Sequence, residues 1–369
     1  MGQDMAMSPK DLNQGPILES QPLKILGGEN AVNFDLCLAP MVGLSHVALR
    51  ELCRDYMPAG AHTIWPTEML NSRRLPSEHL GSTPETSKHN FEENLVPQIL
   101  GNEEFFIARS IEKLVEWGAV AIDINMGCPV QKALKHNYGV ALMGDAHYAA
   151  EVVRMSVRNS KVPISVKLRA VHESEANALF DFIKGIEDAG ASWITLHPRT
   201  AAQKRRGSAD WDQIREIGSR ISIPIIGNGD IQTCDDILRM KSETNCAMVM
   251  AGRALTARPW LFWQLGERLG FSPPAVYAGK NAPQTPLEEG AEYGRALKKM
   301  ALLCEKYFGE NLGLRKFRFF VKTGSSWLMF GHQLYALMTK AKNFTEVQTY
   351  LGEFFALEQE MNARTDLRQ

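Results

Sequence analysis

Seven consecutive residues, Asp123 to Pro129, combine polar, flexible and reactive side chains in a pattern that can support chemistry. An apolar run from Ala119 to Ile124 leads into them, and a glycine and a proline then break the chain on either side of Cys128. Strands of α/β proteins carry functional groups at their carboxyl ends, so we expect Cys128 to face a crevice. Its thiol could donate a proton, attack a substrate or bind a metal, or it could be an inert buried thiol.

The apolar run before Cys128 is one of eight short apolar or β-branched segments. These predicted strands lie at residues 36–40, 62–66, 96–100, 120–124, 164–168, 193–196, 223–226 and 247–250. Segments with helical periodicity separate them, and this alternation is typical of parallel sheets. Eight such units over about 230 residues predict an α/β fold of the (β/α)8 TIM-barrel class. A doubly wound open sheet is the alternative, but no G-x-G-x-x-G motif follows the first strand.

The predicted barrel occupies residues 34–270 of the 369-residue chain. Residues 1–33 are polar and form an expected N-terminal tail, and residues 271–287 contain four prolines and one glycine and form a predicted linker. Residues 288–369 show only helical periodicity, which predicts a small C-terminal helical bundle. Its expected helices lie at residues 287–307, 313–330, 332–339 and 345–361.

Polar side chains stand at the predicted carboxyl ends of most strands. In a TIM barrel these ends meet on one rim and form the active site. The second strand is expected to end near Thr67 and Glu68. The side chains expected at the other ends are Gln98, Asn125, Cys128, Lys167, Arg169, His197, Arg199, Asn228, Asp230 and Arg253.

The segments after the seventh and eighth strands predict a phosphate site. They read Gly227-Asn228-Gly229-Asp230 and Gly252-Arg253, at the place where TIM barrels commonly bind phosphate. Glycine lets the backbone approach the anion closely, and Arg253 adds charge-assisted hydrogen bonds. The sequence therefore predicts a ligand that carries phosphate.

Flavin mononucleotide (FMN) is a ligand that would use the other strand ends. Lys167 could lie at the electron-rich edge of its ring, Gln98 could bond the pyrimidine edge, and the Pro40-Met41 backbone could support one ring face. A phosphosugar isomerase or aldolase is the alternative, in which Lys167 would form a Schiff base or act as a base.

Composition limits the partners and the compartment. The six cysteines are scattered without a C-x-x-C pair, which argues against a zinc site or a disulfide framework and favours reduced thiols in the cytoplasm. No apolar run approaches the roughly 20 residues that span a bilayer. The net charge is −1, so an anionic partner must meet a local basic patch.

Residues 311–345 provide such a patch, because they contain no Asp or Glu. Their basic residues are Arg315, Lys316, Arg318, Lys322, Lys340 and Lys342. Four aromatic residues are interleaved with them, Phe317, Phe319, Phe320 and Trp327, and these belong either to the bundle core or to the same surface.

Several of these motifs, in this order and spacing, resemble those of the tRNA-dihydrouridine synthases. The matching segments are Leu38-Ala39-Pro40-Met41, Asp123-x-Asn125-x-Gly127-Cys128-Pro129, Gly139-x-Ala141-Leu142-Met143, Val166-Lys167-Leu168-Arg169, His197-x-Arg199-Thr200, Asn228-Gly229-Asp230 and Gly252-Arg253. The resemblance covers about residues 36–260 and, more weakly, the helical tail.

The resemblance implies an FMN enzyme that uses NADPH to reduce a uridine of tRNA to 5,6-dihydrouridine. Hydride passes from N5 of the reduced flavin to C6 of the base, and Cys128 then protonates C5. The implied cofactor-binding residues are Pro40, Met41, Gln98, Lys167, His197, Asn228, Gly229, Asp230, Gly252 and Arg253. The residues expected to contact tRNA are Asn125, Lys132, Lys135, Arg169, Arg199, Arg315, Lys316 and Arg318.

The chemistry of the residues agrees with this implication, because a thiol is neutral at pH 7 and can still give up its proton. An FMN-dependent dehydrogenase of a free pyrimidine, such as dihydroorotate, is the alternative enzyme, and an RNA-binding protein without activity is a third hypothesis. Gly127 in place of Ser, the lack of iron–sulfur cysteine spacing and the basic tail favour tRNA. We expect a monomer without a protein partner.

Overall fold

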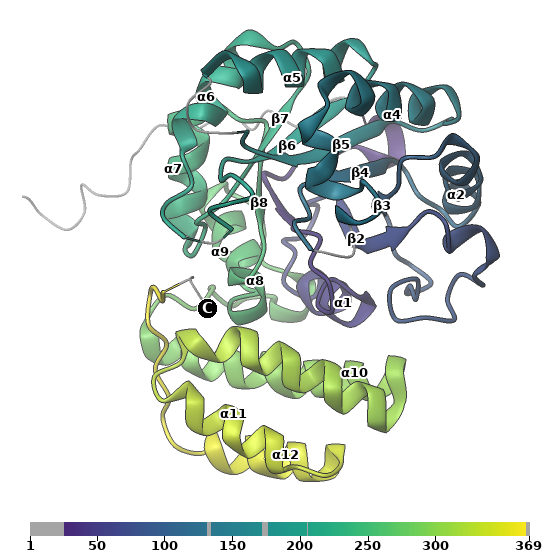
Figure 1. The fold of residues 1–369 in the computed structure, drawn as a ribbon. Coiled ribbons are helices and arrows are strands. Elements are labelled where there is room, and N and C mark those ends of the chain that lie inside the picture. Colours follow the sequence, from purple (N-terminus) through teal and green to yellow (C-terminus); the bar gives the residue numbers. More distant parts are fainter. Residues whose placement is uncertain (1–25, 131–133, 172–175, 205, 367–369) are drawn as a thin grey trace, which may run out of the picture.

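A computed structural model describes residues 26–130, 134–171, 176–204 and 206–366. Eight parallel strands form one sheet in the order β1-β8-β7-β6-β5-β4-β3-β2, and helices surround them (Figure 1). The predicted TIM barrel is therefore confirmed. The strands are β1 (Leu36–Leu38), β2 (Trp65–Asn71), β3 (Leu95–Leu100), β4 (Ile122–Met126), β5 (Ile164–Arg169), β6 (Trp193–His197), β7 (Ile225–Asn228) and β8 (Met248–Ala251).

The barrel helices are amphipathic and bury their apolar faces against the strands. On α2, for example, Ile107, Ile111 and Leu114 recur at helical spacing and are all buried. The helices of this layer are α1 (Val47–Arg54), α2 (Glu104–Glu116), α4 (Ala146–Arg158), α5 (Ala176–Asp188), α6 (Trp211–Arg220), α7 (Cys234–Thr244), α8 (Ala254–Ala257) and α9 (Leu261–Arg268).

β1 and β2 are the two edge strands of the sheet, and they lie next to each other without backbone pairing. Thr63 Oγ1 donates a hydrogen bond of 2.7 Å to the Leu36 carbonyl. β2 continues to Asn71, beyond the end expected near Thr67 and Glu68, and its pairing with β3 shifts register between Pro66 and Met69. The expected end was wrong because this irregularity replaces the apolar alternation with buried polar residues.

One apolar cluster lies between the strands and the surrounding helices, and a separate one fills the barrel interior. It includes Cys37, Val96 and Ile226 from the strands. Leu26 and Val32, which lie in the expected N-terminal tail, belong to the same cluster and are buried. These two residues of the expected tail therefore pack into the barrel core, while Gly27, Asn30 and Ala31 beside them are exposed.

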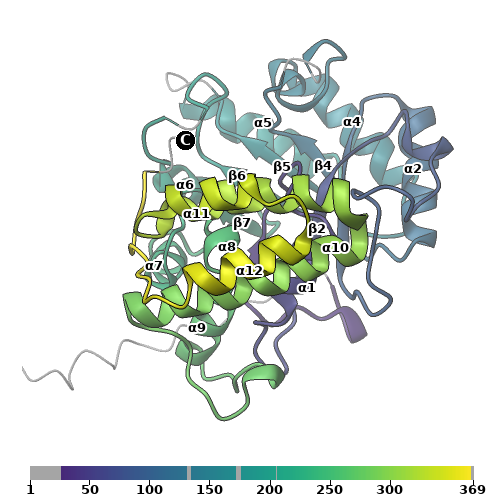
Figure 2. The same ribbon diagram turned by 90° about the horizontal axis from the view of Figure 1, so that it is seen from below.

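The C-terminal helices lie against one side of the barrel (Figure 2). They are α10 (Pro286–Gly324), α11 (Gly331–Lys340) and α12 (Phe344–Phe354). Gly309 interrupts α10 with non-helical backbone angles, so the two helices expected from the sequence form one element with a break. None of the helices in the described ranges combines the length and apolar character of a bilayer span.

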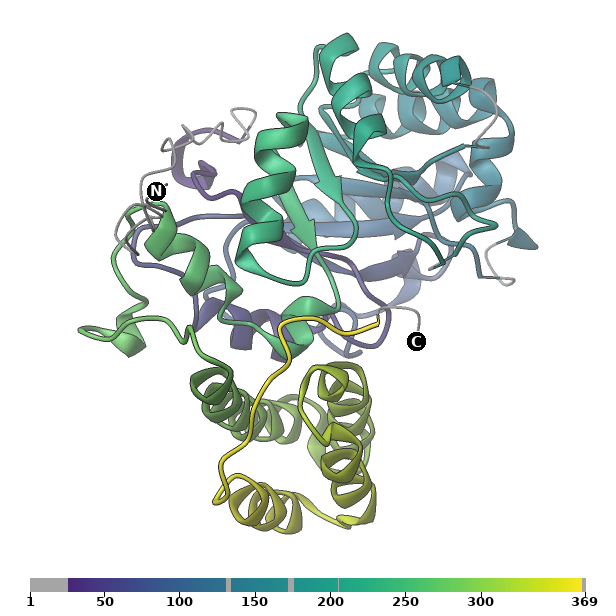
Figure 3. The same ribbon diagram turned by 90° about the vertical axis from the view of Figure 1, so that its left-hand side faces the viewer.

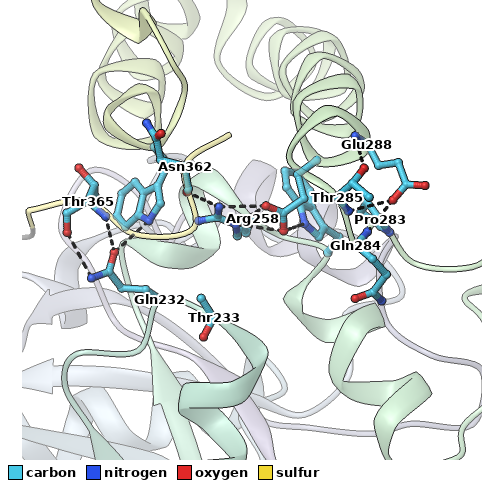
Figure 4. Close-up of polar contacts among 12 residues, drawn as sticks. Gln232, Thr233, Arg258, Pro283, Gln284, Thr285, Glu288, Asn362 and Thr365 are labelled. Carbon is cyan, nitrogen blue, oxygen red and sulfur yellow. Dashed lines mark hydrogen bonds and ion pairs between the residues drawn. The ribbon is translucent and has the colours of Figure 1, made fainter. Parts of the chain in front are cut away.

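Buried polar contacts fix the helical domain to the barrel. The last described residues, 355–366, return from that domain to the barrel (Figure 3). Gln232 accepts hydrogen bonds from Trp327 Nε1 at 3.1 Å and from the Thr365 backbone N–H at 2.9 Å. Arg258 forms an ion pair with Glu289 at 2.9 Å and donates to the Asn362 carbonyl (Figure 4).

Candidate active site

A cavity of about 610 Å³ opens at the carboxyl ends of the strands. Every strand, or the loop that follows it, contributes to its wall, because parallel strands deliver their ends to one rim. The wall contains fourteen residues expected from the sequence: Pro40, Met41, Gln98, Asn125, Cys128, Lys167, Arg169, His197, Arg199, Asn228, Gly229, Asp230, Gly252 and Arg253.

Three buried polar side chains from β3 and β4 form a hydrogen-bonded chain. Gln98 Nε2 donates to Asp123 Oδ2 at 2.7 Å, and Asn125 Nδ2 donates to Gln98 Oε1 at 2.7 Å. Ser165 Oγ donates to the other Asp123 oxygen at 2.6 Å. Burial raises the pKa of Asp123, and these hydrogen bonds oppose that rise. A carboxamide can form four hydrogen bonds, so Gln98 keeps one donor and one acceptor for a ligand.

The loop that carries Cys128 is held by its neighbours. The Asn125 side-chain oxygen accepts hydrogen bonds from the backbone N–H groups of Gly127 at 3.1 Å and Cys128 at 2.9 Å. Arg169 Nε donates to the Gly127 carbonyl at 2.9 Å. Gly139 packs so closely that a Cβ there would lie 2.6 Å from the Cys128 carbonyl oxygen. Cys128 is a free, partly exposed thiol whose position is therefore well defined.

Two titratable side chains behind the cavity have strongly shifted pKa values. Burial, with a contribution from Arg169, lowers the pKa of Lys167 to about 8, although Asp123 opposes the shift. Burial and then the charge of Lys167 lower the pKa of His197 well below its usual value. At pH 7 the cavity therefore holds a cationic lysine beside a neutral imidazole.

Two glycines at the ends of β7 and β8 pack closely against neighbouring side chains in the cavity wall. Gly229 has φ +125°, and a Cβ there would lie 2.7 Å from Ala209 Cβ and 3.1 Å from His197 Cδ2. A Cβ at Gly252 would lie 3.2 Å from Met41 Sδ. A larger residue at either position would collide with these side chains, so glycine is needed for the strand ends to pack this closely in the cavity wall.

Side chains also fix the loops at the ends of β1 and β7. The Met41 N–H donates to Ser45 Oγ at 2.9 Å, and that hydroxyl donates to the Ala39 carbonyl at 2.6 Å. Asn228 Nδ2 donates to the Met250 carbonyl of the adjacent strand at 2.8 Å. These bonds hold the backbone around Met41 and Asn228 in place.

Arg199 and Asp230, which the family resemblance assigned to substrate and cofactor respectively, bind each other. Arg199 Nη2 lies 2.6 Å from Asp230 Oδ1, and the arginine side chain is only 5% exposed. Asp230 also accepts from the Ala209 N–H at 2.6 Å, and Arg199 donates to the Gly207 carbonyl at 2.6 Å. The pair therefore orders the loop after β6 as well as lining the cavity.

The expected RNA-contacting residues fall into different environments. Lys316 is largely buried and lies 3.4 Å from Glu68. Arg318 donates to the backbone carbonyls of Met338 and Ala341 at the end of α11. Arg315 is exposed on α10.

The loop after β4 carries two further predicted contacts. Lys135 is exposed and does not line the cavity among the described residues. Lys132 lies outside the described residues.

One wall of the cavity could not be predicted from the sequence. This wall comes from the C-terminal part of the chain and consists of Phe319, Lys322, Thr323, Ser326, Trp327 and Asp366. Phe319 and Lys322 belong to the basic stretch that the sequence highlighted, but nothing in its pattern placed them at the strand ends. No sequence pattern indicated Asp366, because it reaches the cavity only where the C-terminal segment returns to the barrel.

Comparisons with known proteins identify the family. The family model described as "Dihydrouridine synthase (Dus)" matches residues 37–354. A "Probable tRNA-dihydrouridine synthase" of Mycobacterium tuberculosis H37Rv is 32% identical over 327 residues, which cover 85% of this chain and 80% of that protein. "tRNA-dihydrouridine synthase B" of Pseudomonas aeruginosa is 31% identical over 285 residues, covering 76% and 80%.

A solved structure shows the same fold at low sequence identity. Histamine dehydrogenase from Rhizobium sp. 4-9 superposes with a TM-score of 0.51 at 11% identity, and the match covers 78% of this chain and 51% of that chain. This similarity supports the barrel architecture alone, whereas the family match spans most of both domains. The chain belongs to the dihydrouridine synthase family, whose members act in tRNA modification.

Proposed function

We propose that this protein reduces the C5–C6 double bond of a uridine in tRNA, with Cys128 as the proton donor to C5. The observation that carries the proposal is the free thiol of Cys128, which reaches the cavity from a loop held by Asn125. The family match supports the reaction class. The family resemblance implies the role of Cys128 as proton donor, and the position of its thiol in the cavity wall supports that role.

FMN is the proposed cofactor, because the residues present fit its parts. The corner beside Gly229 and Gly252 suits the phosphate, and Arg253 in the same wall adds positive charge. The remaining donor and acceptor of Gln98 suit a ring edge that offers both kinds of group. When bound, FMN supplies the hydride for the reduction, and we propose NADPH as the electron donor.

The role proposed for Cys128 is to hold one proton and release it to carbon. The acid must stay protonated until the base is in place, and a positioned general acid contributes roughly 10²–10⁴-fold to a rate. The hydrogen bonds from the Gly127 and Cys128 backbone to Asn125 fix where the thiol can reach. Asn125 is thus a positioning residue, and its closeness to the thiol also suits contact with the base.

Lys167 is proposed to stabilise negative charge in the bound ring system. Its pKa of about 8 leaves it mostly protonated at pH 7, and burial strengthens its electrostatic effect. Neutral His197 complements it by offering a hydrogen bond without adding charge.

The tRNA is proposed to present its uridine flipped out of the folded RNA, at a cost of a few kcal/mol. Arg169 lines the cavity and is proposed to contribute positive charge toward the RNA, whereas the charge of Arg199 is paired with that of Asp230. All six cysteines are free thiols, which supports our proposal of a cytoplasmic enzyme. We propose that it acts as a monomer.

The proposal is tested with the purified protein. We expect flavin absorbance, and we expect dihydrouridine to form when NADPH and a tRNA transcript without modified bases are added. Free uridine and orotate serve as comparison substrates. A protein that reduces orotate as well as it reduces tRNA would support the free-pyrimidine dehydrogenase and contradict the proposal.

A further inference from the structure

Helix α10 places a partly exposed aromatic ring in the cavity wall. Phe319 keeps 43% of its surface exposed, whereas Phe317, Phe320 and Trp327 of the same stretch are buried. Val42, which also lines the cavity, is 59% exposed. Phe319 and Val42 therefore form an exposed apolar ledge in the cavity wall. Bundle packing accounts for the three buried rings but not for Phe319.

The ledge has a fixed position beside the loop after β1. A Cβ at Gly43 would lie 3.0 Å from Phe319 Cε1, so the ring rests directly on that backbone. The Gly43 N–H donates to Glu68 Oε2 at 2.5 Å, and Lys316 Nζ lies 3.4 Å from the other oxygen of Glu68. The loop, β2 and α10 are thus connected immediately below the ring.

The junction between the domains limits movement of α10. Gln232 binds Trp327 and Thr365, and Arg258 binds Glu289 near the start of α10 (Figure 4). Trp327 is 1% exposed and follows α10 directly. Both ends of the helix are therefore anchored to the barrel, and Phe319 between them is held at the cavity.

Two cations share the helix face of Phe319. Arg315 lies four residues before it and Lys322 three residues after it, spacings that place side chains on one face. Both are exposed, and among the described residues neither side chain has a hydrogen bond or ion pair. Lys316 and Arg318, by contrast, bind protein groups. The pattern is one aromatic ring between two available cations, with no acidic residue from 311 to 345.

We infer that Phe319 stacks on an unpaired nucleobase next to the target uridine, while Arg315 and Lys322 bind the phosphates on either side of it. Single-stranded nucleic acid is bound in this way, with aromatic rings under the bases and cations along the backbone. This inference rests on the proposed function and adds the group that holds the RNA strand at the cavity mouth. A flipped uridine needs such a hold, because its neighbours also lose stacking.

Equilibrium binding of unmodified tRNA transcript to the full-length holoenzyme tests the inference. Phe319→Leu keeps an apolar side chain but loses the ring face, so we expect its Kd to rise at least about fivefold. Phe319→Trp keeps the ring and should stay within about twofold of the wild type. Phe105→Leu is the matched control, because Phe105 is 59% exposed on α2 and lies outside the cavity wall.

The phosphate contact proposed for Lys322 is tested by the salt dependence of the same Kd. Lys322→Gln should reduce the slope of log Kd against log salt concentration by about one, which is the change expected when one phosphate contact is lost. Lys298→Gln, an exposed lysine in the first half of α10, is the control and should keep the wild-type slope.

Three outcomes would overturn the inference. They are an unchanged Kd for Phe319→Leu, an equal loss for Phe105→Leu, or a loss of flavin from Phe319→Leu that accounts for the weaker binding. In the last case Phe319 would contact the cofactor and not the RNA. Because binding is measured without turnover, a wild type that binds tRNA through Phe319 but forms no dihydrouridine would contradict the proposed function and leave the inference intact.

Discussion

At the scale of residues, the site depends on hydrogen bonds that connect side chains from neighbouring strands. The sequence predicted that Gln98, Asn125 and Cys128 would share a cavity, because each stands at a strand end. It did not predict that Asp123 orients Gln98 or that Asn125 holds the Cys128 loop. Those links depend on the register between strands, which a single sequence does not specify.

Lys167 makes the site sensitive to pH. Its lowered pKa means that its positive charge is complete well below pH 8 and is lost as the pH rises through about 8. If that charge contributes to FMN binding, the affinity of the apoprotein for FMN should fall above this pH, by up to about tenfold per pH unit. Fluorescence titration with FMN between neutral and alkaline pH measures this.

Lys167→Met removes the titrating group. It should bind FMN more weakly at pH 7 and show no further decline above pH 8. A variant that keeps the wild-type decline would show that another group is responsible.

At the scale of elements, apolar periodicity predicted the strands and most helices, but it failed where polar residues are buried. β2 was misplaced because Thr67 and Glu68 interrupt its apolar pattern while remaining inside the structure. The break between the two helices of α10 was expected between residues 307 and 313, and the structure places it at Gly309. Glycine marks that break in the sequence because few other residues tolerate its backbone angles.

Gly309 has φ +65° and ψ −177°, a conformation that is almost restricted to glycine. Gly309→Ala should therefore lower the free energy of unfolding by about 1–3 kcal/mol. Gly352→Ala in α12 is the matched control, because a Cβ there meets open space and no positive φ opposes it. That change should raise stability by about 0.4–1 kcal/mol. Urea unfolding of both variants decides the point, and equal effects would contradict the assignment of strain to Gly309.

At the scale of the whole molecule, the barrel and the C-terminal part of the chain line one cavity. Composition predicted a barrel and a basic helical tail, but not that α10 and Asp366 would complete the cavity wall. The contact between Gln232 and Thr365 joins residues 133 positions apart, and no local pattern encodes a pairing at that separation. The interface that carries this arrangement is centred on Glu289, which accepts hydrogen bonds from Arg258, Trp260 and Gln264.

Removing Glu289 should therefore weaken the docking of the domains. Arg258 is 1% exposed, so Glu289→Ala leaves a buried cation without its partner and should cost about 3–5 kcal/mol. The neighbouring Glu288 only caps the exposed start of α10, and Glu288→Ala should cost about 0.3–1.5 kcal/mol. The midpoints of urea unfolding compare the two variants. Similar losses would mean that the buried pair does not stabilise the interface.

The central claim is that Cys128 gives its proton to the uridine of a bound tRNA. Its most direct test is a single-turnover reaction, in which the reduced holoenzyme is mixed with excess unmodified tRNA and dihydrouridine is measured over time. Cys128→Ala, compared at equal flavin content, should react at least about 100-fold more slowly than the wild type. If Cys128→Ala forms dihydrouridine at the wild-type rate, Cys128 is not the proton donor.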